Sequence, residues 1–379
     1  MANVSSSNGI EKYPKLRFPE FTEPWKLQPA EELFENIVDK NHPDDTVLTI
    51  IQGSGTLPRC ESSRNIRYDE KGVANYKKVN MYDYIIHLRS FEGGLEMANS
   101  QGIISPAYTV LRSKKEFAPL FYSAYFHTDE FINHILAKSV EGIRDGRQIS
   151  YEAFKWLPIP TCNIEEQRKI ADLFRVLNDR IKAQQLLVDY LKKYKRGLLQ
   201  AVFNQKIHLT KSEENWQIYK IGDLLKICHG KDFKDIASQQ KTYPVLGTGG
   251  VIDYVDEYIC NWPCVLIGRK GTINKPQYME TPFWTVDTLF YSKPNKNQHP
   301  KFQFYLFQTI NWQKYNEASG VPSLSASTIE SIKVTVPNDE TQVKISNIFS
   351  FVDCRIESKE KCLNNLLLLK KALLQQLFI

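Results

Sequence analysis

An internal repeat constrains this chain more than any other feature of its sequence. When the sequence is shifted by 175 residues, residues 150–203 align with residues 325–378 without a gap, giving 15 identities in 54 positions. The identities are spread along the segment and include an Asn-x-Glu-x-Gln-x-Lys-Ile motif that begins at Asn163 and again at Asn338. Similarity at a fixed distance indicates a duplicated structural unit, so the fold must hold two copies of one frame.

Each copy predicts a long helix. The motif begins with Asn and continues with Glu and Gln within four residues, which is typical of a helix N-terminus. Apolar residues then recur at spacings of three and four, from Ile170 to Val202 and from Ile345 to Leu377, without an intervening proline. About 40 residues at 1.5 Å each give a rod of roughly 60 Å. Two such rods bury their stripes best against each other as a coiled-coil-like pair; the alternative is that each helix packs only on its neighbouring domain.

The segments between the repeats have diverged. They begin with faintly similar markers, Trp25-x-Leu27 and Trp216-x-Ile218, and then share little sequence. A common frame that carries two different β-rich modules suggests two ligands, or two stretches of one ligand. We therefore expect a mixed α/β fold in which two long antiparallel helices separate two β-rich domains, with a pseudo-twofold internal repeat. The expected parts are a lead-in over 1–24, a first module over 25–162, a first helix over 163–203, a linker over 204–215, a second module over 216–337 and a second helix over 338–379.

Composition and charge limit the possible functions. Hydrophobic residues make up 42% and charged residues 24% of the 379 residues, as in ordinary globular proteins. No apolar run is long enough for a membrane span and the first residues are polar, so we expect a cytoplasmic protein. The net charge is +6, with −2 in the first module and +3 in the second. Such weak charge does not suit a binder that uses charge alone, so any nucleic-acid binding must depend on local patches.

The seven cysteines are scattered, odd in number and diluted over a long chain, which predicts reduced thiols rather than a disulfide framework. Cys228-His229 together with Cys260 and Cys264 could supply four zinc ligands, but their spacing fits no standard zinc finger. A strand through residues 264–267 explains Cys264 better, as a small core residue. We therefore expect no metal site.

Several motifs then resemble one known family. They are Pro14-Lys-Leu-Arg-Phe-Pro-Glu-Phe21 before Pro24-Trp25, Ile85-Ile-His-Leu-Arg89-Ser-Phe-Glu-Gly93-Gly94, Val265-Leu-Ile-Gly268-Arg-Lys-Gly271 and Phe283-Trp-Thr-Val-Asp287. Together with the duplicated helices, they resemble the specificity subunits (HsdS, or S subunits) of type I restriction-modification systems. The resemblance covers nearly the whole chain.

The resemblance implies a DNA-binding function. Each module would be a target-recognition domain that reads one half of a bipartite, asymmetric site in double-stranded DNA, and the helices would set the gap and dock the modification subunits. The expected partners are methyltransferase (modification) subunits, two of them, and restriction/translocase subunits. S-adenosylmethionine, ATP and Mg are expected in those partners, and no cofactor is expected in this chain.

In the first module, a basic stretch interleaved with tyrosines predicts DNA contact. The cations are Arg59, Arg64, Arg67, Lys77 and Lys78. Arginine and lysine neutralise phosphates, and arginine also grips guanine O6 and N7. Acidic residues lie in the same stretch, so a solvated loop is the alternative. Arg89 and Ser90 follow a strand-like apolar run and precede Gly93-Gly94, which suits a loop at a DNA groove.

In the second module, the strongest candidate is the loop Gly268-Arg269-Lys270-Gly271-Thr272. It follows the buried-strand pattern Cys264-Val-Leu-Ile and presents two adjacent cations on a tight turn. The loop lacks the Gly-x4-Gly-Lys-Ser/Thr spacing of an NTPase phosphate loop. Lys231 is a further candidate for phosphate contact, although a solvated face explains it equally well.

The sequence offers no catalytic site. An adenine methyltransferase needs an Asn/Asp-Pro-Pro-aromatic loop, and the nearest strings, which begin at Asn261 and Asn274, do not match it. The nuclease-like string Glu357-Ser-Lys359 falls on the second predicted helix. We therefore expect a non-catalytic subunit. The alternatives are a self-contained DNA-modifying enzyme with a degenerate site and a coiled-coil scaffold without DNA specificity.

Overall fold

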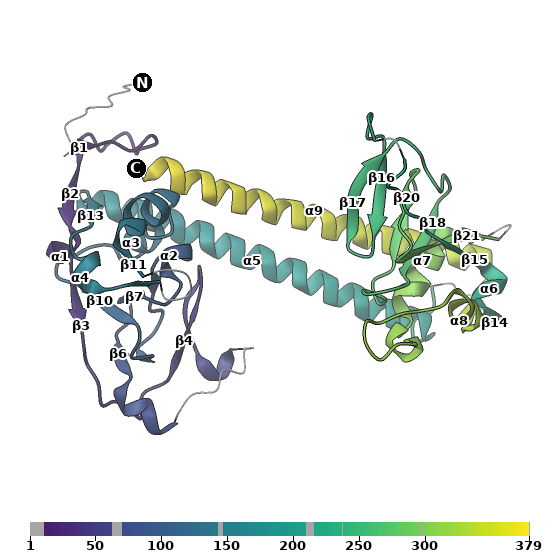
Figure 1. Ribbon diagram of the computed structural model, residues 1–379, viewed down its shortest axis with the longest axis horizontal. Helices are drawn as coiled ribbons and strands as arrows, with labels where there is room; N and C mark the ends of the chain where they lie inside the picture. Colours follow the sequence, from purple (N-terminus) through teal and green to yellow (C-terminus); the bar gives the residue numbers. More distant parts are fainter. Residues whose placement is uncertain are drawn as a thin grey trace. The chain divides into compact units, whose positions relative to one another are not determined.

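The structure is a computed structural model that describes residues 11–62, 70–142, 147–209, 216–236, 238–295 and 298–378. By its internal contacts the chain divides into two compact units (Figure 1). Unit 1 comprises residues 1–185 and 362–379, and unit 2 comprises residues 186–361. Each unit contains one β-rich module together with parts of both long helices, and each is described by itself.

Unit 1 contains thirteen strands and several short helices among its described residues before the first long helix. The strands are β1 (Glu11–Lys12), β2 (Trp25–Pro29), β3 (Phe34–Ile37), β4 (Leu48–Ile51), β5 (Gly55–Pro58), β6 (Lys77–Val79), β7 (Tyr84–Ile86), β8 (Glu96–Met97), β9 (Gly102–Ile104), β10 (Thr109–Ser113), β11 (Val140–Glu141), β12 (Gln148–Ile149) and β13 (Pro158–Thr161). The α-helices are α1 (Ala30–Leu33), α2 (Ser90–Gly93), α3 (Pro119–Tyr125) and α4 (Tyr151–Phe154). Further helical turns are η1 (Arg59–Glu61), η2 (Glu70–Asn75), η3 (Glu130–Ile135) and η4 (Leu136–Ser139).

Unit 2 is built in a similar way. Its strands are β14 (Gln217–Lys220), β15 (Leu225–His229), β16 (Tyr243–Gly247), β17 (Gly250–Val255), β18 (Cys264–Gly268), β19 (Gln277–Met279), β20 (Trp284–Thr285), β21 (Leu289–Pro294) and β22 (Lys333–Val336). Its short helices are α6 (Ile221–Leu224), α7 (Pro300–Thr309), η6 (Trp312–Tyr315) and α8 (Ala326–Ser331).

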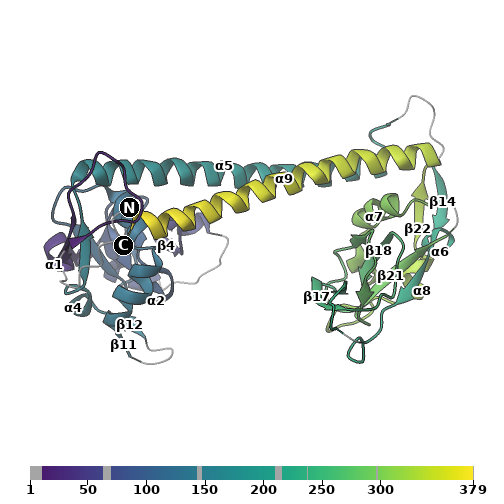
Figure 2. The same cartoon turned by 90° about the horizontal axis from the view of Figure 1, so that it is seen from above.

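The two predicted long helices are confirmed as α5 (Ile164–Phe203) and α9 (Asp339–Leu377). Asn163 and Asn338 accept hydrogen bonds from backbone N–H groups of the first turns, as the repeated motif predicts. Within each unit the helix segments pack antiparallel. In unit 1, α9 ends beside the start of α5, with the Phe174 and Phe378 rings 5.9 Å apart (Figure 2). The mixed fold class is therefore confirmed, whereas the predicted domain boundaries stay a prediction.

The shared frame extends beyond the helices. In unit 1, β2 pairs antiparallel with β13, and in unit 2, β14 pairs antiparallel with β22, so each module is closed by a strand pair at its base. Ser150 caps α4 and Ser325 caps α8, each by accepting a hydrogen bond from a backbone N–H three residues later. Equivalent residues of the repeat therefore make equivalent bonds.

The modules also share a sheet that their sequences do not reveal. Unit 1 contains the four-stranded antiparallel sheet β3-β10-β7-β8, and unit 2 contains β15-β21-β18-β19. If the four strands of each sheet are numbered by their order along the chain, they lie side by side in the order 1-4-2-3 in both units. We predicted two different β-rich modules on one frame. The structure adds that the two modules, whose sequences share little, contain four-stranded sheets of the same strand order.

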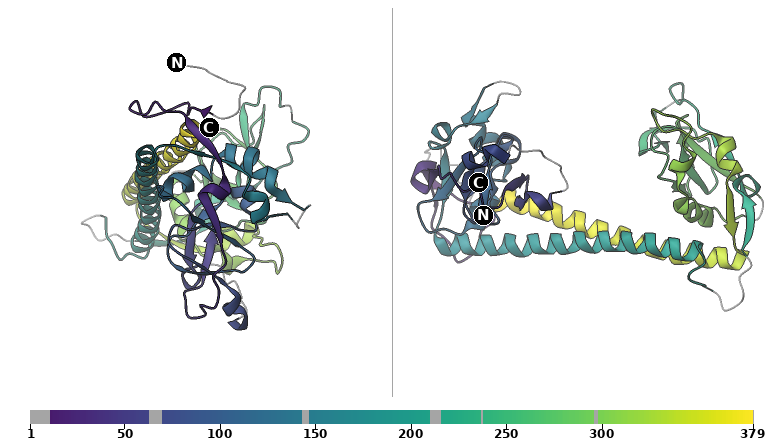
Figure 3. Two further views of the ribbon diagram at one scale, coloured as in Figure 1. Left: turned by 90° about the vertical axis from the view of Figure 1, so that its left-hand side faces the viewer. Right: turned by 90° about the horizontal axis from the view of Figure 1, so that it is seen from below.

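Aromatic residues close the core of each unit. Phe378, which follows α9, packs in unit 1 against Trp25, Phe121 and Tyr125, with ring centroids 5.2–6.0 Å apart. Phe203, the last residue of α5, packs in unit 2 against Trp216 and Phe302. The core of the first module thus includes the end of α9, the helix that follows the second module. The core of the second module includes the end of α5, the helix that follows the first module. Figure 3 shows the end of α9 against unit 1 from two further sides.

Candidate nucleic-acid interface

The basic turn of unit 2 is held rigidly by its own backbone. Strand β18 is buried along its whole length and ends at Gly268, where a Cβ would lie 2.2 Å from the Thr272 carbonyl oxygen. The N–H groups of Arg269 and Lys270 both donate to the Thr288 carbonyl, at 2.8 and 3.2 Å. Gly271 follows with φ +90°, which favours glycine. The turn that was predicted from sequence therefore has a fixed geometry.

The side chains of this turn differ in their freedom. Arg269 is 35% exposed, and its guanidinium lies 3.7 Å from the Asp287 carboxylate, which makes a loose ion pair. Lys270 is exposed and Thr272 is half-buried. Loose pairs at a surface contribute little stability, so Arg269 can exchange Asp287 for another anion at small cost. Lys231 is also exposed, and its backbone is fixed by hydrogen bonds to Thr285 and Trp284.

In unit 1, several of the predicted cations are held by the module itself. The Lys77 ammonium donates to the Tyr108 carbonyl at 2.5 Å, and burial, together with the charge of Lys40, lowers the pKa of Lys77. Lys78 lies 3.3 Å from the Asp45 carboxylate. Arg59 is half-buried on η1. Arg64 and Arg67 lie outside the described residues.

Arg89 and Ser90 have opposite environments. Arg89 has a side chain that is 69% exposed, and its ion pair with Glu92 at 2.6 Å lies at the surface. Ser90 is fully buried, and its hydroxyl accepts a hydrogen bond from the His87 N–H at 2.9 Å. The burial of Ser90 argues against the predicted DNA contact, because its hydroxyl stabilises the turn from inside. Arg89 remains the accessible cation of this loop.

The structure brings Arg89 and Lys270 to equivalent places, which the sequence did not reveal. In the four-stranded sheet of unit 1, Ile85 lies opposite Glu96 and Val110, and in unit 2 Leu266 lies opposite Gln277 and Tyr291. Arg89 lies four residues after Ile85, beyond the end of β7. Lys270 lies four residues after Leu266, beyond the end of β18. Each unit therefore presents a cation at an equivalent place, the loop that follows the second strand of its four-stranded sheet. We call this place the exit of the sheet.

A hairpin lies beside this exit in both units, and the edge strand of the sheet holds its turn. In unit 1, the buried Glu96 carboxylate accepts hydrogen bonds from the N–H groups of Gly53 and Gly55, at 2.5 and 2.8 Å, in the turn between β4 and β5. In unit 2, the Gln277 amide donates to the Gly247 carbonyl at 3.0 Å, next to the turn between β16 and β17. We did not identify Glu96 or Gln277 from the sequence, because neither lies in a recognisable motif.

Glu96 also contacts a histidine and favours its charged form. His127 Nε2 lies 3.1 Å from the Glu96 carboxylate, and Nδ1 lies 2.7 Å from the Ser123 carbonyl oxygen. Both ring nitrogens face acceptors, an arrangement that favours the protonated ring, in which both nitrogens can donate. Burial opposes this charge, but the hydrogen bond to Glu96 and the charge of Glu96 raise the pKa of His127 above its usual range.

Comparison with known proteins relates the chain to one family. Residues 213–368 match the model of the type I restriction modification DNA specificity domain. Over 93% of its length the chain is 21% identical to a putative type I restriction enzyme MjaX specificity subunit of Methanocaldococcus jannaschii, of which the match covers 92%. Residues 213–368 therefore carry a DNA specificity domain of the type I restriction modification kind, and the whole chain is similar to the specificity subunits of such systems.

A second relative and a solved structure agree with this assignment. The type I restriction enzyme EcoprrI specificity subunit of Escherichia coli is 22% identical over 40% of this chain, and the match spans 39% of that protein. The crystal structure of the S subunit of a type I restriction-modification system from M. genitalium has the same fold, with a TM-score of 0.63 and 16% identity. The similarity covers 97% of this chain and 99% of that chain.

Two of the seven cysteines pack in the core of unit 2. Cys260 and Cys264 are buried with their sulfur atoms 3.8 Å apart, and Cys264 opens strand β18, as expected for a small core residue. Among the described residues, no group of three or more His, Cys, Asp or Glu side chains could hold a metal ion. Nor is any described helix long and apolar enough to cross a membrane.

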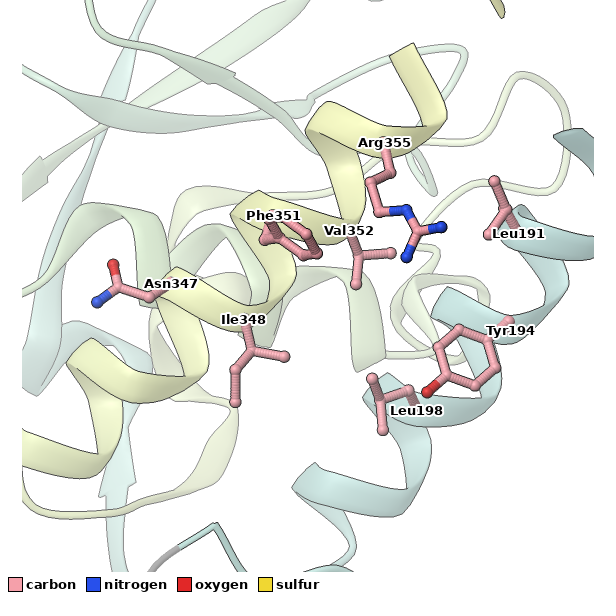
Figure 4. A pocket seen from close by; sticks show the side chains of 8 residues that line it. All are labelled: Leu191, Tyr194, Leu198, Asn347, Ile348, Phe351, Val352 and Arg355. Carbon is pink, nitrogen blue, oxygen red and sulfur yellow. The ribbon is translucent and has the colours of Figure 1, made fainter. Parts of the chain in front are cut away.

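An apolar groove lies between the α5 and α9 segments of unit 2 (Figure 4). Its volume is about 490 Å³. Leu191, Tyr194 and Leu198 line one wall from α5. The other wall belongs to α9 and consists of Asn347, Ile348, Phe351, Val352 and Arg355. Phe351 and Tyr194 are 65% and 50% exposed, so large apolar side chains remain uncovered along this groove.

Proposed function

We propose that this chain is the DNA-recognition subunit of a type I restriction-modification complex and that each module reads one half of a bipartite DNA sequence. One observation carries the proposal: two diverged copies of one sheet each present a cation at the same exit. Duplicated scaffolds with different loops suit the recognition of two different sequences in one ligand. The similarity to type I restriction enzyme specificity subunits supports the same function.

The exposed cations make the contacts with DNA in this proposal. In unit 1 the contact is Arg89, which can exchange its surface partner Glu92 for guanine or phosphate. In unit 2 the contacts are Arg269 and Lys270 on their fixed turn, with Lys231 as a phosphate contact. Fixed backbones with exposed side-chain ends suit base reading, since less freedom is lost on binding. Lys77 and Lys78 contribute less, because module atoms already hold their ammonium groups.

The apolar groove of unit 2 is the proposed contact for a modification subunit. A groove lined by Leu191, Phe351 and Val352 can bury apolar side chains of a partner. The duplicated frame would hold two modification subunits, and restriction/translocase subunits would join the complex. Methylation with S-adenosylmethionine and ATP-driven restriction with Mg would belong to these partners, in the cytoplasm, and this chain would perform no chemistry itself.

Mapping of methylated bases tests the proposal. Long-read sequencing of DNA from cells that carry the modification partner, with and without this chain, should reveal one bipartite methylated motif only when the chain is present. Arg269→Ala together with Lys270→Ala should then relax one half of the motif, and Arg89→Ala should relax the other. Methylation that does not depend on the chain, or equal loss in both halves for each variant, would contradict the proposal.

A further inference from the structure

The β16–β17 hairpin of unit 2 has an unusual surface. In the sheet β17-β16-β20, strand β17 lies at the edge (Figure 1). Four consecutive residues of β17, from Val251 to Tyr254, are exposed, with Val251 and Ile252 at 53% and 56%. Edge strands usually carry charges or bulges that keep other molecules away, and adjacent exposed aliphatic side chains invite a partner. The hairpin therefore has the character of a binding element.

The turn of this hairpin adjoins the basic turn of unit 2. The Gln277 amide donates to the Gly247 carbonyl at 3.0 Å and to the Thr248 carbonyl at 3.4 Å. A Cβ on Gly271 would lie 3.9 Å from the Thr248 hydroxyl, so the two turns are in van der Waals reach. The exposed strand and the cations Arg269 and Lys270 are thus parts of one local surface. A polyanion bound by Arg269 and Lys270 would also contact the hairpin.

A bulge displaces Ile252 from the regular strand. Val245 pairs with Asp253 and Leu246 pairs with Val251, so Ile252 is the additional residue on β17. Bulges increase the local twist and redirect side chains. The neighbouring Gly249 and Gly250 have open space around them, so a large molecule can approach this end of the hairpin closely. Val251 and Ile252 therefore form an accessible apolar tip.

We propose that Val251 and Ile252 contact the 5-methyl groups of thymines in the DNA major groove of one half-site. This inference rests on the proposed function of the chain. The major groove admits a two-stranded β-ribbon, and the thymine methyl is the apolar group that base edges display there. The adjacent Arg269 and Lys270 face the phosphates or guanines that flank these thymines. Asp253, the acidic residue between the apolar tip and Tyr254, can accept a hydrogen bond from a cytosine amino group.

A selection experiment tests the contact in the assembled complex. The specificity subunit with its modification partner is used to select duplexes from a randomised pool, first with the natural chain and then with Val251→Ser and Ile252→Ser combined. The natural chain should enrich a bipartite sequence with thymine in the half-site of unit 2. The double variant should lose that thymine preference, keep the other half-site, and bind the selected duplex about tenfold more weakly. Ile218→Ser, at a residue of β14 that is 69% exposed, serves as the matched control.

Replacement of thymine by deoxyuridine gives a second measurement. It removes only the methyl groups, so the natural chain should lose several-fold in affinity, whereas the double variant should lose less than twofold. The dependence of binding on salt should be the same for both proteins, because no phosphate contact has been removed. Arg269→Ala with Lys270→Ala should instead lower that dependence.

The outcomes separate this inference from the proposed function. If the natural chain enriches no sequence, the proposed function fails and the inference fails with it. If the natural chain enriches a bipartite sequence and the double variant enriches the same sequence with equal affinity, only the inference is wrong. A double variant whose sole defect is weaker assembly with the modification subunit would also overturn it, because the hairpin would then be a protein contact.

Discussion

Two lysines at the same repeat position lie in different surroundings. Lys195 of α5 lies in unit 2, 2.6 Å from the Asp353 carboxylate and over the ring of Tyr305. Its repeat partner, Lys370 of α9, lines a cavity of unit 1 with Asn178, which occupies the repeat position of Asp353. Burial lowers the pKa of Lys370, and the charge of Glu96 opposes that shift. The duplication thus preserved the packing residues of the frame, while its polar residues adapted to each module.

The largest expected effect comes from removing a phenylalanine that holds the same repeat position in both units and packs in the core of each. Phe378→Ala removes a ring that contacts Trp25, Phe121 and Tyr125 in the core of unit 1. Loss of a buried phenylalanine leaves a cavity, so the free energy of unfolding of unit 1 should fall by about 3–5 kcal/mol. Hydrogen exchange measured by mass spectrometry, peptide by peptide, should show faster exchange in unit 1 and little change in unit 2.

Phe203→Ala is the matched variant in unit 2, because Phe203 holds the same repeat position. It should produce the reverse pattern, with faster exchange in peptides around Trp216 and Phe302. If either variant destabilised both units equally, the two cores would not be independent. The comparison between the units would then lose its basis.

A smaller effect, on the pH dependence of stability, should distinguish Glu96 and Gln277, the residues that hold the hairpin turns of unit 1 and unit 2. His127 beside Glu96 has a raised pKa in the folded state, so its contribution to stability is complete below the usual histidine pKa and is lost as pH rises through the folded value. Three charged or titratable groups interact electrostatically with the His127 ring, namely Glu96, Lys370 and His87. Unit 1 should therefore lose stability as pH rises above the ordinary histidine pKa of about 6.5, whereas the neutral Gln277 gives the hairpin of unit 2 no such dependence.

His127→Gln tests this assignment. The amide can still donate one hydrogen bond to Glu96 but carries no charge, so unit 1 should be about 1–2 kcal/mol less stable at pH 6. Its stability should then vary less with pH than that of the natural protein. Urea unfolding at several pH values, followed by hydrogen exchange in each unit, provides the measurement. An unchanged pH dependence in the variant would assign the effect to another group.

The smallest expected effect comes from exchanging the polar partners of the two lysines. Asn178→Asp should give Lys370 a carboxylate like that of Asp353 and stabilise unit 1 by up to about 1 kcal/mol, since the site is only partly buried. Asp353→Asn should destabilise unit 2 by about 1 kcal/mol, as it removes the ion pair of Lys195. Urea unfolding of each variant checks the signs, and destabilisation by Asn178→Asp would show that Glu96 already balances Lys370.

The sequence predicted the frame well, because its signals are local and repeated. The Asn163 and Asn338 motifs, the apolar stripes and the Ser150–Ser325 correspondence all involve contacts within a few residues along the chain. The basic turn at Arg269 was also predictable, since a buried-strand pattern precedes it and glycines flank it. These features needed no knowledge of distant parts of the chain.

Features that depend on contacts between distant residues could not be predicted. The common four-stranded sheet has no shared sequence pattern, since Tyr84–Ile86 and Cys264–Gly268 have only apolar character in common. Glu96 binds a turn more than forty residues away, and no local motif marks it. Ser90 looked accessible because it follows an arginine and precedes glycines, but its hydroxyl turns inward to cap the loop.

The interlocked ends of the long helices have a consequence for synthesis on the ribosome. Unit 1 contains residues that are translated first, yet its core also contains Phe378, which is translated after all of unit 2. Unit 2 draws its residues from a single continuous stretch, so it can complete its core earlier. The module that emerges first therefore finishes folding second, and until then its aromatic cluster lacks the ring that closes it.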